Sequence, residues 1–86
     1  MGQKRGYPQP KNLAAKLLTI RRSLGLSQSK MARQINLPAH YARVSEFERG
    51  RRAPSALVLL AYARAANIPL ENILDDDLEI TIKPAP

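Results

Sequence analysis

The chain has 86 residues, no cysteine, one histidine and a formal net charge of +7 at pH 7. This length suits one small domain, and without cysteine neither a disulfide framework nor thiolate chemistry is possible. With a single histidine we expect no metal site, and nothing in the sequence calls for a cofactor. No apolar run approaches the roughly 20 residues of a membrane span, and the stretch "MGQKRGYPQPKN" lacks the apolar core of a signal peptide. We therefore expect a cytoplasmic protein.

Charge is distributed unevenly along the chain. Residues 1–70 contain 13 basic and only 2 acidic residues, whereas residues 71–86 contain 1 basic and 5 acidic residues. A strongly basic body indicates a polyanionic partner. No segment pairs a long apolar face with a basic face, as an interfacial membrane helix would, so nucleic acid is favoured over a membrane surface.

The beginning of the chain, residues 1–11, is expected to be a flexible basic arm, because it is polar and holds two glycines and two prolines. Two interpretations of its basic residues stay open. Either Lys4, Arg5 and Lys11 enter a minor groove of DNA, or they belong to a disordered end. The folded domain is expected to follow the arm and to span residues 12–75.

Two short helices are expected next. Apolar residues at helical spacing predict the first over residues 13–24, with Asn12 as its N-cap and Gly25 ending it in the left-handed conformation. Ser27 is then the N-cap of a second helix over residues 28–35.

A third helix follows the segment "NLPA", which interrupts the helical pattern. Asn36 tolerates a positive φ, and Pro38 suits the first turn of a helix. The third helix is therefore predicted to start at about Pro38 or Ala39 and to end at Arg49, directly before Gly50.

The basic loop "RRAPS" leads to a fourth, mostly apolar helix over residues 56–66, capped by Ser55. Asn67 ends this helix and Pro69 opens a short fifth one, which the acidic run "DDD" stops. The segment "LEITIKP" then alternates apolar and polar residues, which predicts a strand over residues 78–83. The sequence offers no second strand with which it could pair.

Two short helices joined by a tight turn, inside a basic five-helix domain, are typical of helix-turn-helix DNA binding. The segments "IRRSLGLSQSKMARQI", "VSEFERGRRAPS" and "LLAYARAANIPLENIL" resemble, in this order, the phage-repressor/Cro-like (XRE) helix-turn-helix family. The resemblance covers roughly residues 13–74. It implies an all-α, five-helix, lambda-repressor-like DNA-binding domain, here with a flexible basic N-terminal arm and a short C-terminal β-strand.

The third helix carries the residues to which the resemblance assigns DNA recognition. With Val44 and Phe47 facing inward at about 100° per residue, the outer faces are free to enter the major groove. Base contact is implied for Tyr41, Ala42, Ser45 and Glu46. Two interpretations of Glu46 stay open: it accepts a hydrogen bond from cytosine N4, or it pairs within the helix with Arg43 or Arg49.

Contacts to the DNA backbone are expected around this helix. The residues expected to contact phosphate are Gln28, Arg43, Arg49, Arg51 and Arg52. Relatives hold a phosphate at the position of Gln28, where the helix N-terminus also favours an anion, and they grip the backbone with the loop that holds Arg51 and Arg52. The family joins the positions of Arg21 and Glu48 in a salt bridge, so these two are expected to be structural.

The chain departs from the family pattern in the turn before the third helix, which is longer by a pair of residues near Pro38 and Ala39. Either the turn is lengthened, or the third helix starts half a turn early. The second arrangement would move Ala39 and His40 toward the DNA.

Dimerisation is expected through the C-terminal tail, residues 76–86. Leu78, Ile80 and Ile82 would form one apolar face of a strand that pairs antiparallel with the same strand of a second copy. Other arrangements stay open: a frayed tail, a strand that adds to a different protein, or an interface made by the fourth and fifth helices.

The sequence thus predicts a sequence-specific transcriptional regulator, a repressor, that binds a palindromic operator in double-stranded DNA as a homodimer. The alternative is the antitoxin of a toxin–antitoxin pair, which would bind a protein toxin and regulate its own operon. An enzyme is not expected, because the sequence offers no convergent carboxylates, no Ser/His/Asp set that could meet and no glycine-rich phosphate loop.

Overall fold

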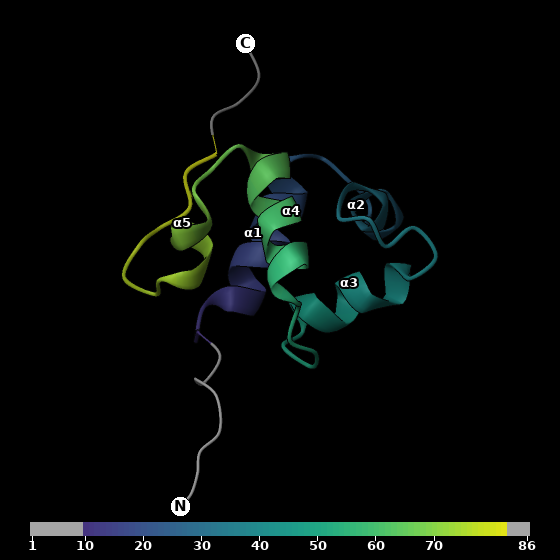
Figure 1. Ribbon diagram of the computed structural model, residues 1–86, viewed down its shortest axis with the longest axis horizontal. Helices are drawn as coiled ribbons and strands as arrows, with labels where there is room; N and C mark the ends of the chain where they lie inside the picture. Colours follow the sequence, from purple (N-terminus) through teal and green to yellow (C-terminus); the bar gives the residue numbers. More distant parts are fainter. Residues whose placement is uncertain (1–9, 83–86) are drawn as a thin grey trace, which may run out of the picture.

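The computed structural model describes residues 10–82 of the chain, and this part is all-helical. The helices are α1 (Leu13–Ser23), α2 (Gln28–Gln34), α3 (Tyr41–Glu48), α4 (Ala56–Ala66) and α5 (Leu70–Leu74). In Figure 1, α4 stands in front of α1 at the centre, α2 and α3 lie together on one side, and α5 lies on the other. The prediction of an all-α, five-helix domain is confirmed.

One hydrophobic core joins the helices. Its large, fully buried side chains are Leu17, Ile20, Met31, Ile35, Val44, Tyr62 and Ile73. In α1, α3 and α4 the buried positions recur every three or four residues, which places them on one face. Each such aliphatic side chain stabilises the fold by about 1.5–3 kcal/mol when it leaves water. Through Val44 and Phe47, this core fixes the orientation of α3.

Residues with positive φ reverse the chain after each of the first four helices. They are Gly25 (φ 69), Asn36 (φ 66), Gly50 (φ 72) and Asn67 (φ 56). After each reversal, a backbone N–H returns to a carbonyl in the last helical turn; that of Leu37, for example, lies 2.7 Å from the oxygen of Ala32. This is the Schellman arrangement, which favours glycine or asparagine at the left-handed residue. The structure agrees with the sequence at all four reversals.

Two serines begin helices as their sequence positions predict. The hydroxyl of Ser27 accepts the backbone N–H of Lys30 at 3.1 Å, and the hydroxyl of Ser55 accepts that of Val58 at 3.2 Å. Each bond satisfies a helix N–H group that has no partner inside the helix, which is worth about 1 kcal/mol. These caps fix where α2 and α4 begin.

The start of α1 is capped differently from the sequence prediction. The side chain of Asn12 makes no cap hydrogen bond. Instead, the carboxylate of Asp76 accepts the backbone N–H groups of Lys11 at 2.8 Å and of Asn12 at 3.0 Å. These hydrogen bonds hold the pKa of Asp76 below its ordinary value. The acidic turn after α5 therefore caps the N-terminus of α1, the first helix of the domain.

Lys16 of α1 binds the C-terminal end of α5, a contact that the sequence pattern did not indicate. Lys16 is buried, and its ammonium donates to the backbone oxygens of Asn72 and Asp75, both at 2.7 Å. A cation at this end is favourable because helix C-termini present unpaired carbonyls and the negative end of the helix dipole. Lys16 thus ties α5 to α1 by charge-assisted hydrogen bonds.

The predicted C-terminal strand is not formed. Residues 78–82 carry no strand within the part of the chain that the structure describes, and Lys83 lies outside it. The alternation is nevertheless present in the burial, because Leu78, Ile80 and Ile82 are half-buried. Ile80 and Ile82 pack against the core of their own domain. An alternating pattern indicates only which side chains face the same way. Here these side chains belong to an irregular segment that lies on the core, not to a strand.

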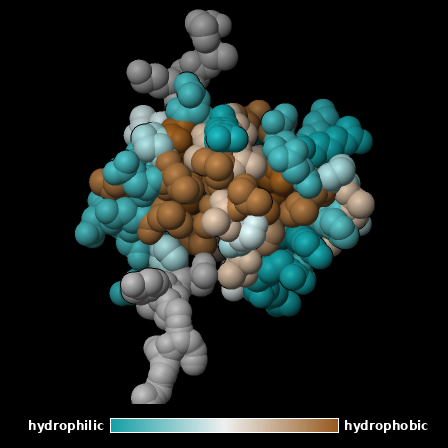
Figure 2. Space-filling view, in the orientation of Figure 1, coloured by the Kyte–Doolittle hydropathy of each residue, from teal (hydrophilic) through white to brown (hydrophobic). Residues whose placement is uncertain are grey.

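Figure 2 shows the surface of the face that carries α4 at its front in Figure 1, and hydrophobic side chains gather across its middle. Leu57 is the most exposed large apolar residue of the described chain, at 78%. Leu60, Ala61 and Ala65, on the same side of α4, are half-buried. The solvent side of this helix is therefore mainly apolar, with Arg64 as its exposed charged residue.

Candidate nucleic-acid interface

The third helix has one buried side and one open side. Val44 and Phe47 are 0% and 3% exposed and anchor α3 on the core. Tyr41, at the first position of the helix, is 59% exposed although it is a large aromatic residue. Ala42 and Arg49 are exposed, and Arg43, Ser45 and Glu46 are half-buried. The outer faces of α3 thus hold all four sequence-predicted base-contact residues.

The turn before α3 is lengthened, and the helix starts later than the sequence pattern suggests. The backbone N–H of His40 donates to the oxygen of Leu37 at 2.9 Å, which closes a turn around Pro38 and Ala39. Helix α3 begins only at Tyr41. The prediction of a start at Pro38 or Ala39 is therefore wrong, because the extra residues are used in a separate turn. Tyr41 consequently occupies the first helical position.

A basic loop leaves α3 through the left-handed residue Gly50. The backbone N–H of Arg51 donates to the oxygen of Glu46 at 2.9 Å and turns the loop back toward the helix. Arg51 and Arg52 are both exposed. The loop and the outer side of α3 therefore share one edge of the molecule.

Glu46 forms an ion pair that neither sequence interpretation included. Its carboxylate accepts a hydrogen bond from Arg52 Nε at 2.6 Å, and the two side chains are 41% and 48% exposed. The partner is thus neither Arg43 nor Arg49 but an arginine from the following loop. A residue expected to read a base and a residue expected to bind phosphate are joined to each other.

Arg21 and Glu48 meet between α1 and the end of α3. Arg21 Nε and Nη2 donate to the two carboxylate oxygens at 2.6 and 3.1 Å, and Nη1 donates to the backbone oxygen of Leu26 at 3.0 Å. The side chain of Glu48 is only 5% exposed. The hydrogen bond to Glu48 raises the pKa of Arg21 above its ordinary value, so the guanidinium of this pair is charged.

Gln28 joins this ion pair, a contact that no pattern in the sequence indicated. Its side-chain amide donates to Glu48 at 3.2 Å. Because a glutamine amide carries two N–H groups, one donor remains for another acceptor. The first residue of α2 is thereby fixed relative to the end of α3.

Tyr62 of α4 is fully buried, and its hydroxyl has no hydrogen-bond partner among the described residues. Burial raises the pKa of this phenol above its ordinary value, and the nearby Glu48 carboxylate raises it further. The phenol is therefore neutral and packs as a large, mainly apolar side chain.

Metal-binding clusters and membrane-spanning helices are both absent from residues 10–82. This part of the chain holds no group of three or more metal-ligating side chains. In the same residues no helix is both long enough and apolar enough to cross a membrane. Of the basic arm only Pro10 and Lys11 are described, so the expectation for Lys4 and Arg5 lies outside the described residues.

The arrangement of α2, the turn and α3 is that of a helix-turn-helix DNA-binding domain. In agreement, a family model described as helix-turn-helix matches residues 17–73, well over half of the chain. The chain belongs to the phage-repressor/Cro-like (XRE) helix-turn-helix family and is a DNA-binding regulator. Searches of the curated proteins and of the solved structures returned no match.

Proposed function

We propose that this regulator is a repressor that reads the major groove of double-stranded DNA with α3. The observation that carries this proposal is the two-sided character of α3, with Val44 and Phe47 anchored and Tyr41 59% exposed at its first position. Residues near the N-terminus of a recognition helix are those that reach base edges in helix-turn-helix domains. Tyr41, Ala42 and Ser45 are the proposed readers of sequence.

Phosphate contacts around α3 would set the register on the duplex without reading sequence. The proposed contacts are Gln28, Arg43, Arg49, Arg51 and Arg52. Arg49, Arg51 and Arg52 are exposed and Arg43 is half-buried. They support this assignment because guanidinium groups match phosphate in geometry and charge. Gln28 keeps one amide donor beyond its bond to Glu48.

The experiment that tests this proposal is selection of bound duplexes from a random pool at two salt concentrations. We expect a short preferred motif and an affinity that falls steeply with salt, as phosphate contacts require. Tyr41→Ala should change the preferred base at one position. If Tyr41→Ala and Ser45→Ala both select the same DNA motif as the wild-type chain, α3 is not the helix that reads the bases.

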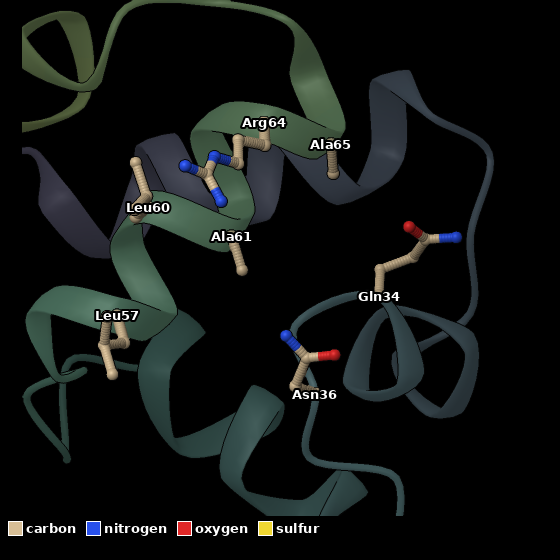
Figure 3. A pocket seen from close by; sticks show the side chains of 7 residues that line it. All are labelled: Gln34, Asn36, Leu57, Leu60, Ala61, Arg64 and Ala65. Carbon is tan, nitrogen blue, oxygen red and sulfur yellow. The ribbon is translucent and has the colours of Figure 1, made fainter.

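The outer side of α4 is the proposed contact between two copies of the chain. It combines the protruding Leu57 with a hollow of about 400 Å³. Figure 3 shows the residues that line this hollow: Leu57, Leu60, Ala61, Arg64 and Ala65 from α4, Gln34 at the end of α2 and Asn36 in the turn after it. A protrusion and a hollow on one face suit a two-fold contact, in which each copy inserts its leucine into the other. Two copies would present two recognition helices to one operator.

Mass measurement in solution tests this contact. Leu57→Ser should shift the chain from dimer to monomer and weaken binding to a palindromic site. Leu74→Ser on α5 is the matched control, because it replaces another exposed leucine, 39% exposed, away from the hollow. An unchanged mass for Leu57→Ser, or a loss of the dimer in both variants, would contradict the α4 contact.

The exposed apolar side of α4 also favours a second candidate function, that of an antitoxin which covers this side with a protein toxin. In that case the chain purified alone would be monomeric, and co-expression with the product of a neighbouring gene would yield a stable complex that Leu57→Ser breaks. If the chain alone forms a dimer and no such complex is found, the antitoxin function is contradicted and the repressor function is supported.

A further inference from the structure

The ion pair between Glu46 and Arg52 links the recognition helix to the loop that follows it. Arg52 Nε lies 2.6 Å from Glu46 Oε1, and each side chain is nearly half exposed. The pair therefore lies at the surface, beside the residues proposed to read DNA.

The backbone brings these two side chains together. Gly50 adopts a left-handed conformation, its N–H donates to the oxygen of Phe47 at 3.2 Å, and the N–H of Arg51 donates to the oxygen of Glu46 at 2.9 Å. The chain direction thus reverses at the end of α3, and the residue after Arg51 is turned back along the last helical turn. Glu46 holds the loop twice, by its backbone oxygen and by its carboxylate.

The electrostatics of α3 give this pair a function. Glu46 and Glu48 are the acidic residues of the helix. Glu48 is nearly buried and is bound to Arg21, so Glu46 is the carboxylate that the outer side of α3 presents. An unpaired carboxylate there would repel phosphate, and the guanidinium of Arg52 neutralises it.

Arg52 keeps most of its donors while it is paired. A guanidinium has five N–H groups, and the bond to Glu46 uses the one on Nε. The two terminal amino groups, with four N–H groups, remain for a phosphate, which they match in a two-pronged geometry. The pair leaves the phosphate-binding edge of Arg52 available and restricts its orientation.

We propose that Glu46 is a positioning residue for DNA binding: it holds the guanidinium of Arg52 at the end of α3, with its terminal amino groups directed at the DNA backbone. This inference rests on the proposed function, in which α3 and its loop face DNA. It assigns Glu46 to the orientation of a phosphate contact rather than to a base. Consequently, the contribution of Glu46 to affinity changes sign when Arg52 is removed.

The test is a cycle of full-length variants: wild type, Glu46→Gln, Arg52→Ala and the double variant. The probe is a fluorescently labelled mixed-sequence duplex of about two helical turns, with affinity measured by anisotropy over a range of salt. In the wild-type background we expect Glu46→Gln to weaken binding about two- to fivefold. In the Arg52→Ala background the same change should strengthen binding about two- to fivefold, because it then removes only a repulsive charge.

Salt dependence gives a second readout that a purely structural role would not move. Arg52→Ala should lower the slope of log affinity against log salt by about 0.9, the value for one lost phosphate contact. Glu46→Gln should lower it by part of that amount, because the arginine remains but is no longer oriented. Glu46→Asp keeps the charge on a shorter side chain, and it should weaken binding at least as much as Glu46→Gln.

Arg51→Ala is the matched control, because it removes the neighbouring charge of the same loop and leaves the Glu46 pair intact. Glu46→Gln should weaken binding in the Arg51→Ala background as it does in wild type. An effect of Glu46→Gln that has the same sign with and without Arg52 would overturn the inference. Failure of the wild-type chain to bind any duplex in a salt-dependent way would instead overturn the proposed function, so the two failures are distinguishable.

Discussion

Arg21 of α1 and Glu48 of α3 are joined by two hydrogen bonds, of 2.6 and 3.1 Å, although they are far apart in the sequence. The carboxylate is 5% exposed and the guanidinium side chain 17% exposed. Since Glu48 ends the recognition helix, this contact fixes the angle of α3 against the rest of the domain.

We expect Arg21→Ala and Glu48→Ala each to lower the free energy of unfolding, because each leaves a charge in a poorly hydrated place. The double variant should lose less than the sum of the two single losses, with a coupling of about 0.5–3 kcal/mol. Urea unfolding of the four proteins measures this cycle. Losses that simply add would mean that the two side chains act independently.

Removing Arg51 should weaken binding without changing specificity. We expect Arg51→Ala to reduce affinity for every duplex alike and to lower the salt slope by about 0.9. Titration of two unrelated duplexes over a range of salt measures both effects. If the slope stays at its wild-type value, Arg51 does not contact phosphate.

Changing the outer side of α3 should alter specificity and spare general affinity. Tyr41→Ala and Ser45→Ala should each change base preference at one position of the operator, by about 1–3 kcal/mol. Competition between the selected site and single-base variants of it measures the change. Arg33→Ala, an exposed charge change on α2, is the control and should keep the wild-type preference.

The cap that Asp76 forms on α1 should make stability depend on pH. Because the pKa of Asp76 is lowered in the folded chain, mainly by the N–H groups of Asn12 and Lys11, the unfolded chain takes up a proton at higher pH than the folded chain does. The stabilisation is therefore complete above the ordinary carboxyl pKa of about 4 and is lost as the pH falls through the lower folded-state value.

We expect Asp76→Asn to lower the Tm at neutral pH and to flatten the fall of Tm below about pH 4. Thermal melts over the acid range measure this. Asp77→Asn makes the same charge change without a bond to α1, and it should keep the wild-type dependence. Equal curves for wild type and Asp76→Asn would contradict the cap.

The unpartnered hydroxyl of Tyr62 predicts a substitution that does not destabilise the core. Tyr62→Phe removes a buried polar atom and keeps the ring, so the free energy of unfolding should be unchanged or higher by up to about 1 kcal/mol. Urea unfolding measures it. A loss larger than about 1 kcal/mol would show that the hydroxyl has a partner, such as a buried water.

The sequence predicts those parts of the fold that depend on neighbouring residues. Ser27 and Ser55 cap helices with bonds to residues three positions away, and Gly25 and Asn67 reverse the chain within one turn. Such local geometry follows from residue type alone. The lengthened turn was visible as a spacing, but its shape was not, because the start of α3 depends on how Val44 and Phe47 fit the core.

The contacts that the sequence did not predict link distant positions. The bond of Lys16 to the end of α5 spans 56 residues or more, and a lysine in an apolar stripe gives no sign of its acceptor. For the tail, period-two alternation predicted a strand, and this is wrong because strand formation also needs a partner. Its three apolar residues are half-buried, and Ile80 and Ile82 pack on the core of their own domain. For Glu46, helical spacing indicated partners within α3, whereas the reversal at Gly50 supplied Arg52 from outside it.

The hydrogen bonds from the N–H groups of Lys11 and Asn12 to Asp76 join the two ends of the domain, which are more than 60 residues apart in the sequence. The first turn of α1 is consequently completed only when the last part of the domain has docked. Amide protons at Lys11 and Asn12 should therefore exchange with solvent at the rate at which the segment after α5 detaches, rather than at the faster rate of an ordinary frayed helix end. The two ends of the domain then open as one cooperative unit, and a ligand that holds either end slows exchange at both.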